Sequence, residues 1–355
     1  MQLLTRLQSF PNRKRCKRMN YETKLLSTSE RDIAYAAKLL ADGEVVGMPT
    51  ETVYGLAADA ENEEAVNNIF EAKGRPQDNP LIVHIADISQ LEDYVHDVPK
   101  LAYKLAEKFC PGPLTMVLPK NDRIPNVTSA GLDTVGIRIP YHPAARKLIL
   151  ESGKALAAPS ANLSGSPSPT TAMHVMNDMK GRIPAIVDGG SCPVGVESTV
   201  ILFENDKIRL LRPGFISVSE LAEFAEVICD KHITEAAIDG EQVRSPGMKY
   251  KHYSPKANVT IVSGSREQYL DYVNGHGGNG VYAMPFDEDT EMCKIPCIPY
   301  GNTSEEQAAR FFAVLREFDD IGAKQVYARC PSTDGVGLAV YNRLLRSAGF
   351  EIITL

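Results

Sequence analysis

The sequence predicts a mixed α/β protein built from two domains. Helical and strand patterns alternate from residue 29 to about residue 226, and they resume after residue 257. The ranges 199–203 and 207–211 flank Glu204-Asn205-Asp206, a composition typical of a hairpin turn between two strands. A hairpin joins antiparallel strands, so the sheet cannot be purely parallel. With 355 residues, the chain is also longer than most single hydrophobic cores require.

The elements of the first domain follow from periodicity and from signals at their ends. Ser29 can cap a first helix, in which Ile33, Ala37 and Leu40 share one face. Gly43 ends that helix. The further expected elements are, in chain order, strand 44–48, a short helix around 66–70, strand 81–85, helix 99–109, strands 114–118 and 134–139, helix 143–152, strand 155–158, helix 170–180, strand 185–188, the hairpin, and helix 217–226.

A linker is expected at 227–257, followed by a small α/β domain at 258–355. Prolines and a glycine in the segment 245–255 disfavour a helix. Because this segment also carries tyrosines, a histidine and lysines, it differs from an inert spacer, and we expect it to close over a ligand as a lid. A plain tether is the alternative. The second domain is expected to contain strands 259–262, 280–284 and 325–328 and helices 304–321 and 336–348.

Charge is spread unevenly over the chain. The net charge is −7, although the first twenty residues hold several bases and no acid. We expect 1–28 to be a disordered basic extension, and Met19 is an alternative start. The acidic remainder argues against sequence-blind binding to a nucleic-acid backbone. Apolar runs are too short to span a membrane, and the seven cysteines form no CxxC pair, so a cytoplasmic location with free thiols is expected.

Two segments of the first domain carry candidate ligand-binding groups. Residues 49–56, Pro-Thr-Glu-Thr-Val-Tyr-Gly-Leu, present hydroxyls directly after a strand, where α/β sheets bind ligands. Lys73 and Arg75 lie two residues apart beside a proline and suit a polyanion such as a triphosphate. Taken alone, an ordinary polar turn and a solvated helix end remain alternative readings, and His84 in its apolar strand could be a hydrogen-bonded core residue.

Two more segments add hydroxyls, amides and cations. Residues 157–168 combine small side chains with Ser160 and Asn162, which can bond phosphate, ribose or base. Arg138 lies within an apolar strand, where a charge is costly unless it meets an anion. Arg212 occupies a similar position at the end of a strand. Together these segments indicate a concave site of cations and small hydroxyls, without a metal-ligand cluster, that suits a nucleoside triphosphate and a small carboxylate.

Lys73-x-Arg75 paired with Ser160-x-Asn162 resembles the signature of the YrdC-like L-threonylcarbamoyl-AMP synthases. The segments PTETVYGL, DNPLIVHI, GIRIP, APSANLSG and ESTV also resemble that family and occur in its order. The resemblance covers about 30–216, and the linker and second domain resemble the longer form. It implies a YrdC-like twisted mixed sheet with a large cationic cavity at 29–226, plus a small C-terminal Rossmann-like α/β domain.

The resemblance also implies an activity. The substrates would be L-threonine, bicarbonate or CO2, and ATP with Mg²⁺, and the products threonylcarbamoyl-adenylate and pyrophosphate. A downstream threonylcarbamoyl transferase would use the adenylate on the tRNA adenosine beside the anticodon, and direct binding of tRNA is left open. No protein side chain is identified as a metal ligand.

Site residues are carried over position by position. The catalytic pair is Lys73 and Arg75. Threonine-binding positions are Thr52, His84, Arg138, Ala158 and Ser198. Nucleotide-binding positions are Arg75, Asn79, Thr134, Ser160, Asn162, Ser168, Arg212 and Tyr250, with Tyr253 as the less favoured alternative to Tyr250.

Two other functions are kept as alternatives. A non-catalytic RNA-binding module would use a cationic cavity to grip structured RNA, but the acidic body weighs against it. A carbamoyl-transfer maturation factor would carry zinc-finger segments, for which the cysteine spacing is wrong.

Overall fold

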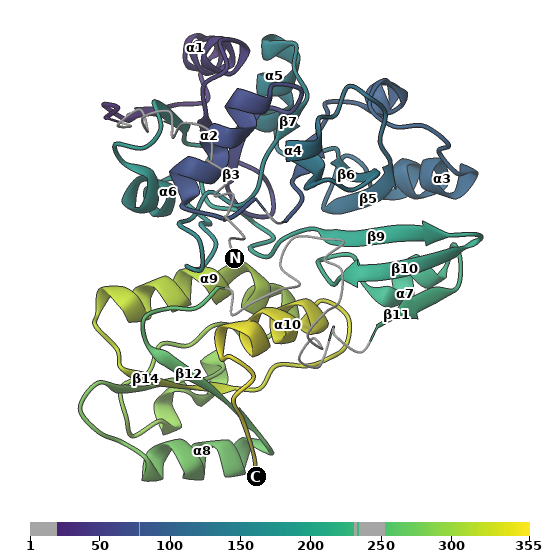
Figure 1. Cartoon of the computed structure of the whole chain (residues 1–355). Helices are drawn as coiled ribbons and strands as arrows, with labels where there is room; N and C mark the ends of the chain where they lie inside the picture. The colour runs from purple at the N-terminus through teal and green to yellow at the C-terminus, as the bar shows by residue number, and fades with distance from the viewer. Residues whose placement is uncertain (1–19, 78, 231–232, 234–252) are drawn as a thin grey trace, which may run out of the picture.

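The structure is a computed structural model that describes residues 20–77, 79–230, 233 and 253–355. The first domain combines many short strands with helices, and Figure 1 shows it beside a smaller second domain. Its strands are β1 (Lys24–Leu26), β2 (Val46–Met48), β3 (Gly55–Asp59), β4 (Ile82–His84), β5 (Leu114–Pro119), β6 (Thr134–Arg138), β7 (Leu156–Ala157), β8 (Ala185–Val187), β9 (Thr199–Glu204), β10 (Lys207–Arg212) and β11 (Val227–Cys229). Its helices are α1 (Glu30–Ala41), α2 (Glu63–Lys73), the 3₁₀ helix η1 (Ile88–Asp93), α3 (Lys100–Phe109), α4 (Asn126–Ser129), α5 (Pro143–Ser152), α6 (Ala172–Met179) and α7 (Val218–Ala222).

These strands form a sheet in the order β1-β8-β2-β3-β7-β4-β6-β5-β9-β10-β11. Neighbours such as β4 and β6 are parallel, whereas β2 and β3, β5 and β6, and β9 and β10 are antiparallel. The mixed pairing confirms the predicted α/β class. The predicted hairpin is also confirmed, with Lys207 paired to Glu204 and the turn residue Asn205 at φ +55°.

The limits of the extension and of the linker need correction. Lys24–Leu26 form β1, which pairs in parallel with β8, so the extension cannot reach residue 28. Val227–Cys229 form β11, which pairs in parallel with β10, so no linker begins before residue 230. Both strands are three residues long, and their pairing partner rather than their own pattern holds them in the sheet. The predicted lid, 245–255, lies almost entirely outside the described residues.

Local signals explain where the helices near the site begin and end. The side chain of Asn62 accepts hydrogen bonds from the backbone N–H groups of Glu64 and Ala65, which caps α2. Gly74 ends α2 in the left-handed region at φ +61°, which glycine adopts at little cost. Because α2 stops there, Lys73 occupies its last turn and Arg75 begins the loop beyond it.

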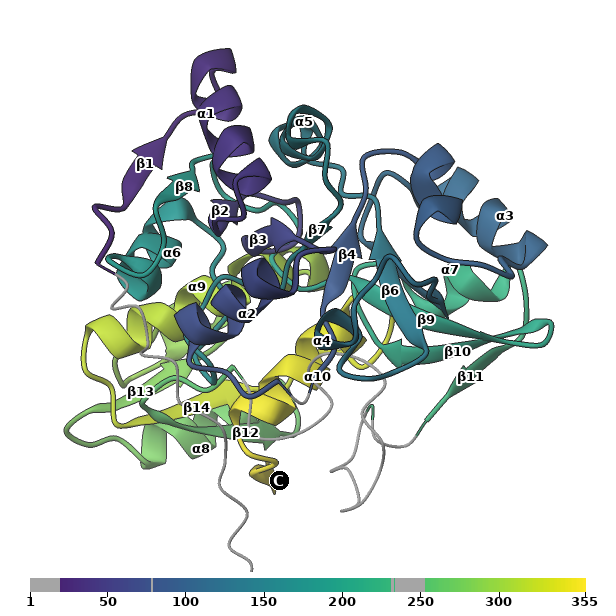
Figure 2. The ribbon, with the colours of Figure 1, turned by 45° about the horizontal axis from the view of Figure 1, so that its top comes forward.

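The second domain is a small parallel α/β unit. It contains β12 (Asn258–Ser263), α8 (Arg266–Gly275), β13 (Val281–Met284), the 3₁₀ helix η3 (Asp287–Met292), α9 (Ser304–Asp320), β14 (Gln325–Arg329), α10 (Gly337–Ser347) and β15 (Ile352–Thr354). The strand order is β13-β14-β12-β15 and all three pairings are parallel. Helices α9 and α10 lie between this sheet and the first domain in both views (Figure 1 and Figure 2).

The two domains share apolar packing where they meet. Val53, Val194 and Val196 of the first domain belong to one buried cluster with Phe311 and Phe312 of α9. Gly195, at φ +74°, makes this approach possible, because a Cβ there would lie 2.3 Å from the carbonyl oxygen of Ala308. The second domain is therefore packed directly against the loops around residues 53 and 195. None of the described helices combines the length and the apolar character needed to cross a bilayer.

Candidate active site

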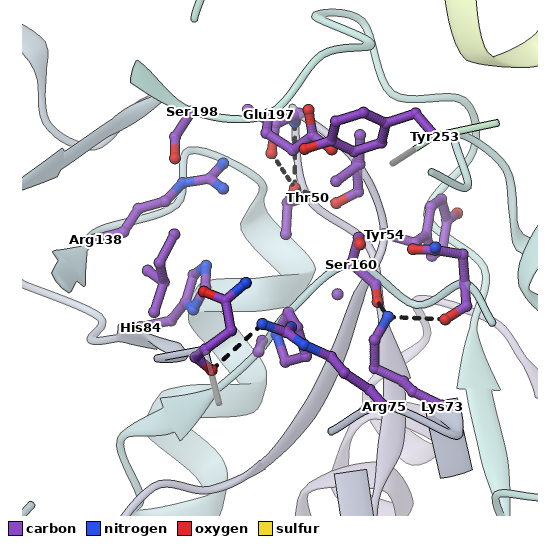
Figure 3. A pocket seen from close by; sticks show the side chains of 18 of the residues that line it. Thr50, Tyr54, Lys73, Arg75, His84, Arg138, Ser160, Glu197, Ser198 and Tyr253 are labelled. Carbon is purple, nitrogen blue, oxygen red and sulfur yellow. Dashed lines mark hydrogen bonds between the residues drawn. The ribbon is translucent and has the colours of Figure 1, made fainter. Parts of the chain in front are cut away.

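A cavity opens where the predicted motifs of the first domain converge. The space between its lining atoms is about 730 Å³, which includes the open solvent at its mouth. Figure 3 shows Lys73 and Arg75 on one side, Arg138 and His84 on a second, and Glu197 with Tyr253 on a third. The predicted site residues that line it are Thr52, Lys73, Arg75, Asn79, His84, Arg138, Ala158, Ser160, Asn162, Ser198 and Arg212. Among the described residues that line it, Lys and Arg side chains outnumber acids four to one, so the cavity is cationic as the resemblance implied.

Lys73 joins the two halves of the signature. Its Nζ donates a hydrogen bond to the carbonyl oxygen of Asn162 at 2.7 Å and another to that of Ser160. Its own carbonyl accepts from the N–H of Ser164 at 3.0 Å. Burial, and then the charge of Arg75, hold the pKa of Lys73 well below its usual value. The lysine thus holds the 160–164 turn and has one further N–H for a ligand.

Arg75 and Asn79 lie on the loop that follows α2. Arg75 donates to the main-chain oxygen of Asn79 at 3.3 Å, and its guanidinium lies 5.9 Å from the ring centre of Phe70. The Oδ1 of Asn79 is buried and has no hydrogen-bond partner among the described residues. Asn162, which also lines the cavity, has a buried Oδ1 without a hydrogen-bond partner among the described residues. Unsatisfied buried acceptors in a cavity wall are suited to a ligand donor.

Arg138 ends β6 beside His84 of β4, with which it pairs in register. One terminal guanidinium nitrogen donates to Glu51 Oε1 at 2.7 Å, and both side chains are about 5% exposed. Glu51 is the anion that the sequence argument required for Arg138. The Nε of Arg138 and the Nδ1 of His84 have no partner among the described residues. Burial, and then the charge of Arg138, lower the pKa of His84 to about 3, so this ring is neutral at physiological pH.

Ser198 and Arg212 form the part of the cavity nearest β9 and β10. The Oγ of Ser198 lies 2.7 Å from the Oγ1 of Thr115 and accepts from a terminal nitrogen of Arg212 at 3.0 Å. The same arginine donates to the Ser198 carbonyl at 3.1 and 3.2 Å. Burial lowers the pKa of Arg212 to about 10.

Small and hydroxyl side chains complete the wall. The hydroxyls of Thr50 and Thr52 lie 2.9 Å apart, and Thr50 donates to the Val53 carbonyl at 2.6 Å. A Cβ on Gly55 would lie 3.1 Å from the Cβ of Ala158, so the start of β3 closely approaches the residue that follows β7 at the cavity wall.

Two predicted positions among the described residues, Thr134 and Ser168, do not line the cavity. Thr134 opens β6 opposite Pro119, at the other end of the strand from Arg138. Ser168 is fully buried behind the wall and donates to Glu197 Oε1 at 2.7 Å. Tyr250 lies outside the described residues. Tyr253, the less favoured alternative, does line the cavity, with its ring 5.3 Å from that of Phe312.

Glu197 is the lining residue whose importance sequence reasoning missed. Its Oε2 accepts from the Nε of Arg343 on α10 at 3.0 Å. Burial by itself raises the pKa of Glu197, but the charges of Arg343 and Arg212 outweigh it and lower the pKa overall. The ESTV segment contained this acid, but nothing in the local sequence pointed to a partner 146 residues away.

The described side chains offer no grouping of three His, Cys, Asp or Glu residues that could hold a metal ion. Both carboxylate oxygens of Glu197 already accept hydrogen bonds.

Comparisons with known proteins agree with these features. A family profile described as "Telomere recombination" matches residues 38–214, and one described as "Threonylcarbamoyl-AMP synthase, C-terminal domain" matches residues 216–349. The threonylcarbamoyl-AMP synthase of Bacillus subtilis is 47% identical over 92% of this chain and 96% of its own length. That of Pyrococcus abyssi is 44% identical over 91% of this chain and 96% of its own length.

A solved structure shows the same two-domain arrangement. The crystal structure of P. abyssi Sua5 complexed with L-threonine superposes with a TM-score of 0.86 at 41% identity, and covers 94% of this chain and all of that one. The RNA-binding module and the maturation factor are not favoured, because these full-length relatives carry the synthase name. The signature, the cavity and the full-length relatives lead to one assignment: this chain belongs to the two-domain threonylcarbamoyl-AMP synthase family.

Proposed function

We propose that this chain makes threonylcarbamoyl-AMP and pyrophosphate from L-threonine, bicarbonate or CO2, and ATP. The observation that carries the proposal is the cavity itself, which joins four cations to hydroxyl and amide groups at the predicted positions. Arg138 and Ser198 suit the carboxylate and polar groups of an amino acid. Lys73, Arg75 and Arg212 suit a triphosphate.

The reaction needs no side-chain nucleophile. The amine of threonine adds to CO2, or to bicarbonate with loss of water, and gives a carbamate. An oxygen of the carbamate then attacks the α-phosphorus of ATP, the bond to the bridging oxygen breaks, and pyrophosphate leaves. The cavity would contribute positioning and compensation of the charge that develops on the phosphates. Mg²⁺ arrives with ATP as part of that substrate.

The product is a mixed anhydride that a second enzyme must consume. We expect a threonylcarbamoyl transferase to accept it for modification of the tRNA adenosine beside the anticodon. We also expect this chain to act in the cytoplasm.

The test is product formation by the purified protein with each substrate omitted in turn. Mass spectrometry of the nucleotide fraction, with pyrophosphate measured in parallel, should show threonylcarbamoyl-AMP when threonine, bicarbonate and ATP are all present. Pyrophosphate release that does not depend on threonine would contradict the proposal. Filter binding with tRNA tests the RNA-binding alternative, which requires tight binding without turnover.

A further inference from the structure

We infer that Arg343, on the second domain, is a positioning residue for the nucleotide half of this cavity, which it serves by compensating the charge of Glu197. The inference rests on the proposed function. It assigns to the second domain a specific electrostatic contribution to nucleotide binding, in addition to its packing against the loops around residues 53 and 195.

The geometry places Arg343 directly behind the cavity wall. The side chain projects from α10 into the first domain and is fully buried. Its Nε donates to Glu197 Oε2 at 3.0 Å, and a terminal nitrogen donates to the carbonyl oxygen of Pro213, the residue after Arg212. Figure 3 shows Glu197 at the cavity wall beside Tyr253.

Through Glu197 this arginine connects three loops that carry site residues. Glu197 Oε1 accepts from Ser168, so the acid holds the end of the 158–168 segment. Ser198 follows Glu197 in the chain and accepts from Arg212. Loss of Arg343 would therefore disturb the loops at Ser168, Ser198 and Arg212 together.

The charge argument is stronger than the contact argument. Among the described residues that line the cavity, Glu197 is the one acid, and it is 7% exposed. A buried carboxylate without its partner would draw the guanidinium of Arg212 toward itself and repel an incoming triphosphate. Arg343 removes that repulsion without taking up space in the cavity, because it contacts Glu197 from behind the cavity wall.

A second arginine supplies a matched control for domain packing. Arg316 of α9 is 9% exposed and donates to both oxygens of Asp178 on α6, at 2.7 and 3.1 Å. It also donates to the Pro167 carbonyl at 2.5 Å. This ion pair crosses the same domain boundary, but neither Arg316 nor Asp178 lines the cavity.

The experiment compares Arg343→Met, Arg343→Lys, Arg316→Met and the double variant Glu197→Gln/Arg343→Met. Calorimetry with Mg²⁺ and a non-hydrolysable ATP analogue gives the nucleotide Kd without requiring turnover, and steady-state assays give KM for ATP and for threonine. Thermal melts report folding.

We expect Arg343→Met to weaken nucleotide binding about tenfold and to change threonine KM less. Arg343→Lys keeps the charge, and the double variant removes both charges, so each should bind the nucleotide within about twofold of wild type.

The outcomes separate charge compensation from packing. Arg316→Met should lower the melting temperature without the tenfold loss of nucleotide affinity. If Arg343→Met fails to fold, the lysine and double variants decide. A double variant that binds the nucleotide tenfold more weakly than wild type overturns the inference. An equal loss of affinity in Arg343→Lys and Arg343→Met overturns it as well. If wild type binds nucleotide but forms no threonylcarbamoyl-AMP, the proposed function fails and the binding comparison still stands.

Discussion

Lys73 is bound to two main-chain carbonyls of the opposite motif, which explains why Lys73-x-Arg75 and Ser160-x-Asn162 occur as a pair. Lys73→Ala should therefore lose both the 160–164 turn and a donor to the triphosphate. We expect pyrophosphate release to fall about a hundredfold, on the order of 3 kcal/mol, with the fold intact. Lys73→Arg is the control, since it keeps the charge but cannot fit the same two acceptors. Near-normal turnover in Lys73→Ala would contradict the assignment.

Arg138 is expected to bind the carboxylate of threonine. One of its terminal nitrogens is held by Glu51, which leaves its Nε and the remainder of a planar fork for the substrate. A lysine can reproduce neither the fork nor the simultaneous contact with Glu51. Arg138→Lys should therefore weaken threonine binding by about tenfold and ATP binding less, as measured by calorimetric titration of each ligand. Equal losses for both ligands would mean that the arginine serves the architecture.

His84 should make the protein sensitive to acid. Its folded pKa is about 3, below the ordinary value of 6.5, so between these values the unfolded chain binds a proton that the folded chain excludes. Stability is therefore complete above pH 6.5 and is lost as the pH falls. Both proteins should become less stable between pH 7 and pH 5. The free energy of unfolding should fall by about 2 kcal/mol less in His84→Gln than in wild type.

Urea unfolding at the two pH values measures the effect of His84. Burial also lowers the pKa of His174, to about 4, so that residue contributes to the acid sensitivity of both proteins and cancels in the comparison. If wild type and His84→Gln lose the same free energy of unfolding between the two pH values, His84 is protonated in the folded state.

At the scale of elements, the sequence predicted best what local signals control. Helix 143–152 has its predicted limits, and the hairpin of β9 and β10 lies where Asn205 and its neighbours indicated. Strand β3 was missed because Gly55–Asp59 is buried on both faces and shows no alternation. The predicted helix 217–226 is shorter, since α7 covers only Val218–Ala222.

The site residues were predictable only where a motif carried them. Eleven of the predicted positions line the cavity, because consecutive strands and loops of one domain deliver them to one place. The ion pairs of Arg316 and Arg343 were not predictable, because each partner lies more than a hundred residues away and on another domain. Packing between domains, rather than any local pattern, brings these side chains together.

Gly195 tests the element that joins the domains. A Cβ there would lie 2.3 Å from the Ala308 carbonyl of α9, and the residue has φ +74°. Gly181, at φ +79°, has no atom within 4 Å of the same Cβ position and serves as a control. Both Gly→Ala variants should lose about 1 kcal/mol from backbone strain. Gly195→Ala should lose about 2 kcal/mol more in denaturant titrations, because α9 must move. Equal losses would mean that the contact with α9 is not stabilising.

At the scale of the whole molecule, the second domain contributes one side of the domain interface and packs behind the cavity wall, where Arg343 contacts the lining residue Glu197. Helices α9 and α10 carry the apolar residues that pack on Val53 and Val196, and they also carry Arg316 and Arg343. Tyr253, which lies within the predicted linker, is buried, belongs to this apolar cluster and also lines the cavity. Stability of the second domain and binding at the site should therefore be coupled.

Two phenylalanines of α9 measure that coupling. Phe312 and Phe318 are both fully buried, but the ring of Phe312 packs 5.3 Å from Tyr253, whereas that of Phe318 packs 5.9 Å from Tyr282 within the second domain. Either Phe→Ala variant should lose about 3–5 kcal/mol of stability. Only Phe312→Ala should also raise KM for ATP at a temperature where both variants remain folded, because Tyr253 loses its support. An equal rise in KM in both variants would show that the site responds to the stability of the second domain in general and not to Tyr253.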